Sequence, residues 1–159
     1  MITPSGEGTD RFYVMSLSDF NSDLYWYYNA YGKMNEKDTS TDFGAGVTNT
    51  AKMIEKWNEN KDKDKNGYGL QNEDDIWGQI QEKVEKGWFV PSKDEWSAFG
   101  GELGIRDSMN SFDKGLKEWY WTSSQYDSKV IWGVDFTYGL FGNTLQASST
   151  ERVRLSTTF

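Results

Sequence analysis

One segment of the chain carries oxygen-bearing side chains at the spacing of a calcium-binding loop. Residues 62–73 match the pattern D-x-[DN]-x-[DN]-G-x5-E at every defined position. The ligands would be the side chains of Asp62, Asp64 and Asn66, the carbonyl of Tyr68 and a bidentate Glu73. Lysines alternate with these acids, which favours a second interpretation, a solvated loop between two helices. The sequence therefore offers calcium as a candidate cofactor and requires none.

Residue types needed for most enzyme chemistry are absent. The chain has no cysteine and no histidine, which excludes thiol nucleophiles, histidine-based triads and most transition-metal sites. Among the carboxylates, Asp74 and Asp75 lie where a helix N-terminus favours negative charge. Asp127 and Asp135 show no apolar surroundings that would make one of them an acid and the other a base. We therefore expect that this protein is not an enzyme.

Charge and hydropathy limit the classes of partner. The formal net charge is −8 and the calculated pI is about 4.6, whereas binding to nucleic acids or anionic membranes needs clustered Lys and Arg. No apolar run approaches the length of a membrane-spanning helix. We expect neither a nucleic-acid partner nor membrane insertion. Aromatic residues make up 16% of the chain, which is typical either of a tryptophan-rich core or of a recognition surface.

The first half of the chain shows helical signals. Residues 1–10 are small, polar and glycine-rich, which predicts a linker or a frayed start, so that residues 11–159 form a single domain. Residues 12–17 are a candidate first strand. Helices are expected over residues 50–59, 73–86 and 93–103. Ser92 and Glu95 form a capping box at the start of the third helix, and Gly87 ends the second.

From Trp119 onward the pattern changes to that of strands. Strands are expected over residues 119–122, 130–136 and 152–155, with turns at Gly139 and Gly142. Alternation places Trp132, Val134 and Phe136 on one face of the second strand, and Ile131, Gly133 and Asp135 on the other. Helices followed by antiparallel strands indicate an α+β fold, with helices packed on small antiparallel sheets.

Several motifs together resemble a known family. Residues 87–96 read GWFVPSKDEW, residues 119–124 read WYWTSS, and residues 152–155 read RVRL, with Ile131-Trp132, Phe136 and Gly139 between them. These motifs resemble the bacterial C-type-lectin-like domains, a group that includes the formylglycine-generating-enzyme superfamily. The resemblance spans residues 87–159, and the stretches 46–50 and 74–78 look like the same family. It implies a C-type-lectin-like fold.

Within this group the chain most resembles the variable proteins of diversity-generating retroelements. In those proteins a fixed scaffold carries a hypervariable ligand-binding face, whose coding segment is rewritten at adenines. Scaffold-like residues such as Trp121, Ser123 and Val153 are interleaved here with chemically arbitrary ones. Most of the interleaved residues are reachable by mutating the adenines of an AAC codon, whereas Lys129 and Glu151 are not. The resemblance implies a protein or glycan ligand on a target cell, and an extracellular, cell-surface or virion location such as a phage tail.

The expected ligand-contacting residues lie on the C-terminal strands and loops. They are Tyr126, Asp127, Ser128, Lys129, Ile131, Gly133, Asp135, Thr137, Tyr138, Leu140, Phe141, Asn143, Ser148, Ser149, Thr150 and Arg152. For Tyr126 and Tyr138, exposure is also favoured by polar neighbours near turns. Two alternatives stay open, namely a structural or adhesin domain without a variable face and a formylglycine-generating-type enzyme, against which the missing Cys and His argue. The sequence indicates no oligomeric state.

Calcium binding to residues 62–73 would stabilise the folded protein, because a ligand that binds only the native state shifts the unfolding equilibrium. Under the metal-site interpretation, the melting temperature rises as calcium is added. A calcium titration followed by thermal unfolding measures this. An unchanged melting temperature at millimolar calcium would leave the solvated-loop interpretation.

Overall fold

The computed structural model describes residues 12–27, 38–60, 74–106 and 108–159, and these residues form a mixed α+β fold. The helices are α1 (Gly46–Asn60), α2 (Ile76–Gln79), α3 (Gln81–Val84), α4 (Lys93–Glu102) and α5 (Ser108–Asp113). The strands are β1 (Tyr13–Met15), β2 (Asn21–Tyr25), β3 (Trp119–Gln125), β4 (Val130–Asp135), β5 (Leu140–Gln146), β6 (Thr150–Val153) and β7 (Ser156–Thr158). The α+β class expected from the sequence is confirmed.

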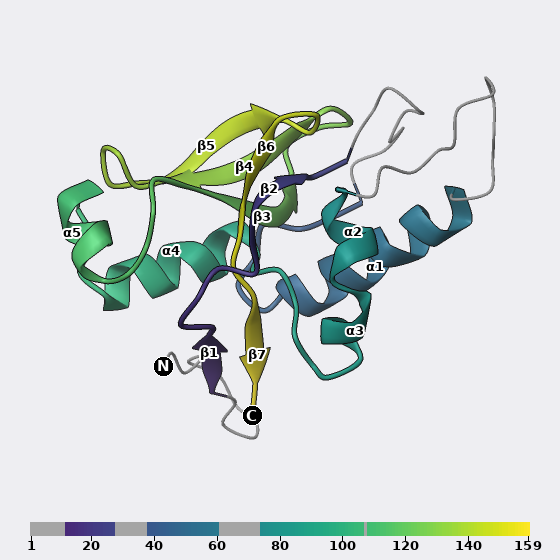
Figure 1. Cartoon of the computed structure of the whole chain (residues 1–159), viewed down its shortest axis with the longest axis horizontal. Coiled ribbons are helices and arrows are strands. Elements are labelled where there is room, and N and C mark those ends of the chain that lie inside the picture. Colours follow the sequence, from purple (N-terminus) through teal and green to yellow (C-terminus); the bar gives the residue numbers. More distant parts are fainter. Residues whose placement is uncertain (1–11, 28–37, 61–73, 107) are drawn as a thin grey trace.

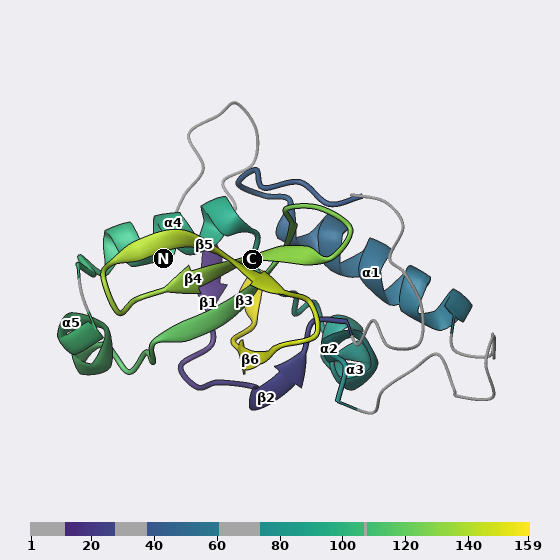
Figure 2. The same cartoon turned by 90° about the horizontal axis from the view of Figure 1, so that it is seen from above.

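The strands are arranged in two sheets. β1 and β7 form a 2-stranded sheet, and the others form a 5-stranded sheet in the order β2-β6-β3-β4-β5. Figure 1 shows the larger sheet above α4, with β1 and β7 at the lower end of the molecule. Seen from above, in Figure 2, β5 forms one edge of the larger sheet and β2 the other. The C-terminal half of the chain thus supplies most of the larger sheet.

The strand boundaries differ from the expected ones in two places. β5 was not expected, and Gly142 lies inside this strand rather than in a turn. Polar and glycine residues give β5 a weak strand signal, but its pairing with β4, for example Gly133 opposite Asn143, supplies the backbone hydrogen bonds. The strand expected over residues 152–155 is divided, because β6 ends at Val153 and β7 begins at Ser156 in the other sheet.

The helix expected over residues 73–86 is interrupted. Residue 73 lies outside the described residues, and the rest forms α2 and α3, separated at Ile80, whose φ is −91° and ψ −2°. Helix formation begins only at Ile76 because Asp75 is held in an extended conformation, bridged to Tyr25. The residues Ile76, Trp77 and Ile80 are buried and belong to the core. Helix α5 was not expected.

Helix α4 begins as predicted. The Glu95 amide donates to Ser92 Oγ over 3.2 Å, and the Ser92 amide donates to Glu95 Oε2 over 2.7 Å, which completes the capping box. Gly87, with φ at +85°, closes the preceding turn, a conformation that favours glycine. Local sequence signals therefore determine where this helix begins.

The core lies on both faces of the larger sheet. On the face next to α4, Trp96 packs against Tyr120 and Phe136, with ring centroids 4.9 and 5.9 Å apart. A second cluster contains Trp121, Trp26 and Trp77. The rings of Trp26 and Trp77 meet edge to face, with their centroids 5.0 Å apart. Much of the aromatic surplus is thus core, because such rings bury large apolar areas.

Arg154 is part of this core and has a structural role. Its guanidinium pairs with Asp19, with Nε donating to Oδ1 over 2.7 Å, and also donates to the Gly115 carbonyl over 2.8 Å. It lies over the ring of Tyr120, whose hydroxyl donates to the same Asp19 oxygen. Burial raises the pKa of Tyr120 to about 12. The buried charge is therefore paired and hydrogen-bonded, as burial requires.

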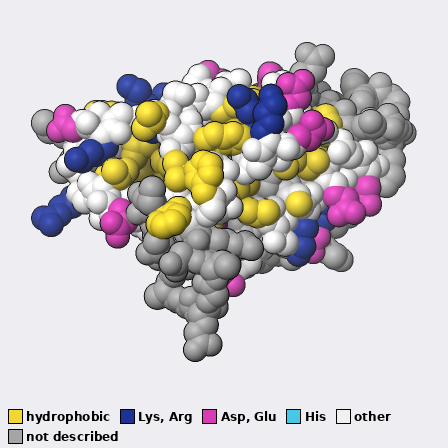
Figure 3. Space-filling model, turned by 90° about the horizontal axis from the view of Figure 1, so that it is seen from below, with side chains coloured by type: hydrophobic (Ala, Val, Ile, Leu, Met, Phe, Trp, Pro, Cys, Tyr) yellow, Lys and Arg dark blue, Asp and Glu magenta, His cyan; other side chains and the backbone are white. Residues whose placement is uncertain are grey.

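Hydrophobic side chains are also exposed on the underside of the molecule. Figure 3 shows them gathered near the centre of the face seen from below. Val14, Leu17, Leu103 and Leu116 contribute to the lining of a pocket of about 370 Å³ between β1 and the end of α4. Leu17 is almost fully exposed. None of the residues predicted to contact a ligand lines this pocket. Separately, none of the helices in the described ranges is long and apolar enough to span a membrane.

Two glycine-to-alanine substitutions should have opposite effects on stability. A Cβ at Gly46 would overlap Glu95 Oε2 and lie 2.8 Å from Phe89 Cδ2, both buried. Gly46→Ala should therefore lower the free energy of unfolding by about 1–3 kcal/mol. Gly101 lies in α4, and an added Cβ there would meet no neighbouring atom within 4 Å. Gly101→Ala should therefore raise the free energy of unfolding by about 0.5–1 kcal/mol. Urea unfolding measures both values, and equal effects would contradict the close packing at Gly46.

Candidate ligand-binding surface

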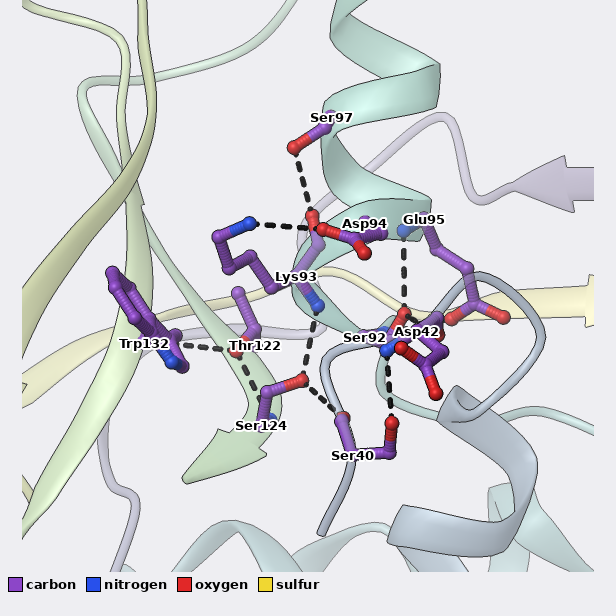
Figure 4. Close-up of polar contacts among 10 residues, drawn as sticks. All are labelled: Ser40, Asp42, Ser92, Lys93, Asp94, Glu95, Ser97, Thr122, Ser124 and Trp132. Atoms are coloured by element: carbon purple, nitrogen blue, oxygen red, sulfur yellow. Dashed lines mark hydrogen bonds and ion pairs between the residues drawn. The ribbon is translucent and has the colours of Figure 1, made fainter. Parts of the chain in front are cut away.

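Buried hydroxyl groups join α4 to the middle of the larger sheet (Figure 4). Ser124 Oγ accepts from the Lys93 amide over 3.1 Å and donates to the Ser40 carbonyl over 2.8 Å. Thr122 Oγ1 donates to the Trp132 carbonyl over 2.6 Å and accepts from the Ser124 amide over 3.0 Å. β3 is thereby tied to α4, to β4 and to the loop before α1, so the strand positions are held by directional bonds.

The loop at residues 38–45 is bound to the same assembly. Ser92 Oγ donates to the Asp42 carbonyl over 2.8 Å, and the Gly44 amide donates to Glu95 Oε1 over 3.1 Å. Glu95 is fully buried, and its carboxylate forms no ion pair with any residue in the described ranges. Burial raises the pKa of Glu95, while backbone donors at Ser92, Gly46 and Gly44 oppose that rise. We call this set of contacts, centred on Ser92, Glu95 and Ser124, the polar frame.

The far end of β3 is attached in the same way. The Gln125 amide donates to Thr39 Oγ1 over 2.7 Å, and Asn49 Nδ2 donates to Ser123 Oγ over 3.2 Å. These side chains are buried. The chain leaving β3 therefore enters its turn from a fixed position.

The turn between β3 and β4 carries exposed predicted contact residues. Tyr126 is 52% exposed, and Asp127 and Lys129 are also exposed, while Ser128 is partly buried. Asp127 Oδ1 accepts from the amides of Lys129 and Val130 over 2.7 and 2.9 Å, which makes the turn well defined. The exposure of Tyr126 that the sequence predicted is confirmed.

The other turns carry further predicted residues. Tyr138, between β4 and β5, is 76% exposed, as predicted, beside a partly buried Thr137. Ser148 and Ser149, between β5 and β6, are partly buried, and Thr150 is exposed. Asn143 is partly buried on β5. The backbones of Leu140 and Phe141 belong to β5, but their side chains lie outside the described part of the structure.

The predicted contact residues do not form one continuous patch. The Ala147 amide donates to the Lys129 carbonyl over 2.8 Å, so the β3–β4 and β5–β6 turns lie at the same end of the sheet. The β4–β5 turn, with Tyr138, lies at the opposite end of β4. A ligand touching both ends would therefore extend along the length of the strands.

Residues on β4 require corrections. Ile131 is 1% exposed and packs in the core with Trp121 and Ala147, so its assignment to the contact surface is wrong. Its neighbour Trp132, which alternation places on the same face as Val134 and Phe136, is only partly buried. Trp132 meets the ring of Tyr126 edge to face at 5.2 Å, with Lys93 Nζ 5.5 Å from its centroid. The alternation is correct, but the cluster around Trp121 covers the face that carries Ile131, so parity alone does not tell which face is core.

Gly133 and Asp135 are also buried, the latter with 4% of its surface exposed. Arg152 is only half-buried, but its register with Tyr120 places it on the α4 side, with Arg154. Glu151, which is not among the predicted contact residues, takes the opposite face instead. The sequence did contain a signal for this arrangement. Glu151 lies two residues before Val153 and therefore shares its face, and Val153 packs in the same core cluster as Trp121. Strand register therefore decides which of the two residues, Glu151 or Arg152, lies on the α4 side.

The proposed calcium ligands, in residues 62–73, lie outside the described residues. Within the described residues, no group of three or more acidic side chains is arranged to hold a metal ion. Comparison of the chain with models of known protein families gives no match, and comparison with curated proteins gives none either.

The buried carboxylate of Glu95 should make stability depend on pH in a defined direction. Burial raises the pKa of Glu95 in the folded state. The stability that this shift contributes to the folded protein is therefore fully present below the ordinary pKa of the side chain, and it is lost as pH rises through the folded-state pKa. Relative to Glu95→Gln, which cannot titrate, the wild-type protein should lose stability as pH rises from about 4.5 towards neutrality. Thermal unfolding across pH measures this, and Glu102→Gln, an exposed site on the same helix, controls for charge loss. A parallel pH profile for wild type and Glu95→Gln would contradict the prediction.

Proposed function

We propose that this chain is a non-enzymatic ligand-binding module with a C-type-lectin-like fold, which displays replaceable contact residues on the C-terminal strands and turns. The observation that carries the proposal is the contrast along β3 and its turn. Thr122, Ser123, Ser124 and Gln125 are fully buried and hydrogen-bonded, whereas Tyr126 and Asp127, which follow at once, are exposed. A rigid base directly joined to exposed side chains suits recognition.

Rigidity matters here because binding costs conformational entropy. A turn whose backbone is already held by Asp127 Oδ1 and by the Val130 carbonyl loses little freedom when a ligand binds. Tyrosine adds a large contact area with few rotatable bonds, and Tyr126 and Tyr138 are the most exposed aromatic side chains on these turns. Substitution at such positions changes the contacts without disturbing the polar frame.

The residues on which the family resemblance depends support the fold assignment. Trp96 and Trp121 lie in the core, with Trp96 Nε1 donating to the Trp121 carbonyl over 3.2 Å. Ser124 and Glu95 belong to the polar frame. These roles suit scaffold positions of a C-type-lectin-like domain. The pairing of β1 with β7 also brings the first and last described strands together.

The ligand is proposed to be a protein or a glycan on a target cell, and the module to be part of an extracellular, cell-surface or virion protein diversified by a retroelement. A structural or adhesin domain without a variable face is the main alternative. An enzyme of the formylglycine-generating type is a further one, although the chain contains no cysteine or histidine. Metal content and turnover assays test the enzyme alternative.

The coding DNA tests the variable-protein proposal. We expect a near-identical template sequence close to the gene and beside a reverse-transcriptase gene, differing from the coding copy only at adenines. The differences should fall on the codons of turn residues such as Tyr126 and Tyr138, and spare those of the polar frame, because frame substitutions would unfold the scaffold. Genomic sequencing of the region measures this. If no such cassette is found, the non-variable alternative is favoured.

A further inference from the structure

Apolar side chains surround a hollow on the underside of the molecule. The pocket of about 370 Å³ between β1 and the end of α4 is lined by Val14, Met15, Leu17, Phe99, Leu103 and Leu116, among others. Leu17 is 97% exposed and Leu103 39% exposed, so both belong to the rim of the pocket. Exposed leucines beside an apolar hollow indicate a surface that another molecule covers.

The apolar surface continues from the pocket along the 2-stranded sheet. Phe12 precedes Val14 by two residues and therefore lies on the same face of the strand as Val14. Its backbone exchanges hydrogen bonds of 3.2 and 3.1 Å with Phe159, so the two rings share that face. Phe12 is 38% exposed and Phe159 77% exposed. A small molecule in the pocket would leave both rings in water, so a protein surface fits this patch better.

Two exposed side chains of opposite charge line the same pocket. They are Glu102, the last residue of α4, and Lys114, which follows α5. Neither forms an ion pair with another residue of the described ranges, whereas Arg154, the third charged residue of the lining, is paired with Asp19. Figure 3 shows charged side chains of both signs around the apolar ones on this face. An anionic partner would be repelled by Glu102 and a cationic one by Lys114, so the partner must carry both signs.

We propose that this underside surface pairs with a second copy of the chain about a two-fold axis. In such an interface each residue faces the same counterpart in both directions. Leu17 of each copy then enters the pocket of the other, and Glu102 of each copy meets Lys114 of the other. A protrusion, a hollow and charges of both signs on one patch are the elements that a self-complementary surface needs.

The dimer is compatible with the rest of the molecule. None of the residues predicted to contact a ligand lines this pocket, so the inference goes beyond the proposed function and does not depend on it. The net charge of −8 on each copy opposes their approach. At physiological ionic strength this repulsion is screened beyond about 8 Å, whereas the apolar and ionic contacts of the interface act at shorter range.

Analytical ultracentrifugation of the full chain at physiological salt tests the dimer. We expect the dimer fraction to rise as the protein concentration is raised to about 1 mM. Leu17→Asp should weaken dimerisation by about tenfold or more, because it carries a carboxylate into the apolar pocket. Val47→Asp, at an exposed apolar residue of α1 outside the pocket, is the matched control and should change dimerisation by less than about twofold. Circular dichroism establishes that each variant is folded, as expected for substitutions of exposed side chains.

Exchange of the two rim charges tests the two-fold geometry. Glu102→Lys and Lys114→Glu should each weaken dimerisation by about threefold or more, because like charges then face each other across the interface. The double variant exchanges the charges and restores opposite pairs, so its dimerisation should return to within about twofold of wild type. A chain that stays monomeric at 1 mM, equal weakening by Leu17→Asp and Val47→Asp, or a double variant no better than the single ones would each overturn the inference. These results leave the proposed function standing, because that proposal depends on the coding-DNA comparison.

Discussion

The burial of Glu95 is the constraint on which the described structure depends. A carboxylate removed from water without a cation is stabilised here by backbone amides at Ser92, the residue that caps α4, and on the loop before α1. Because the donors belong to different segments, the side chain can be satisfied only when the segments are assembled. Ser92 and Ser124 extend the same bonding to β3. The N-terminus of α4 is thus placed against the sheet, with Trp96 pointing into the core.

Packing on both faces of the sheet explains the exposure pattern of its strands. Trp96, Tyr120 and Phe136 fill one face, and the cluster around Trp121 fills part of the other. The sheet therefore has no wholly solvated side, and its turns carry the exposed side chains of Tyr126, Asp127, Lys129 and Tyr138. This arrangement lets turn residues vary in chemistry while the core and the polar frame stay unchanged, which is the physical basis of the proposed recognition role.

Charged side chains on the two sides of the sheet differ in whether they form ion pairs. Arg154 and Asp19 form a paired, hydrogen-bonded contact beneath the sheet that also orders Tyr120. On the other face, Asp135 is the register partner of Trp119 and forms no ion pair within the described residues.

The sequence alone determined the features that depend on neighbouring residues. The Ser92–Glu95 capping box, the end of a turn at Gly87, the α+β order of elements and the exposure of Tyr126 and Tyr138 follow from local hydrogen bonding, backbone conformation and turn polarity. Only the tertiary structure decided the rest. β5 exists because β4 pairs with it, the helix expected over residues 73–86 begins only at Ile76 because Asp75 is bridged to Tyr25, and Ile131 is core because the cluster around Trp121 covers its face of the sheet. Arg152 shares the α4 side of the sheet with Tyr120, and Glu151 does not, because strand register, a long-range property, sets which residues share a face.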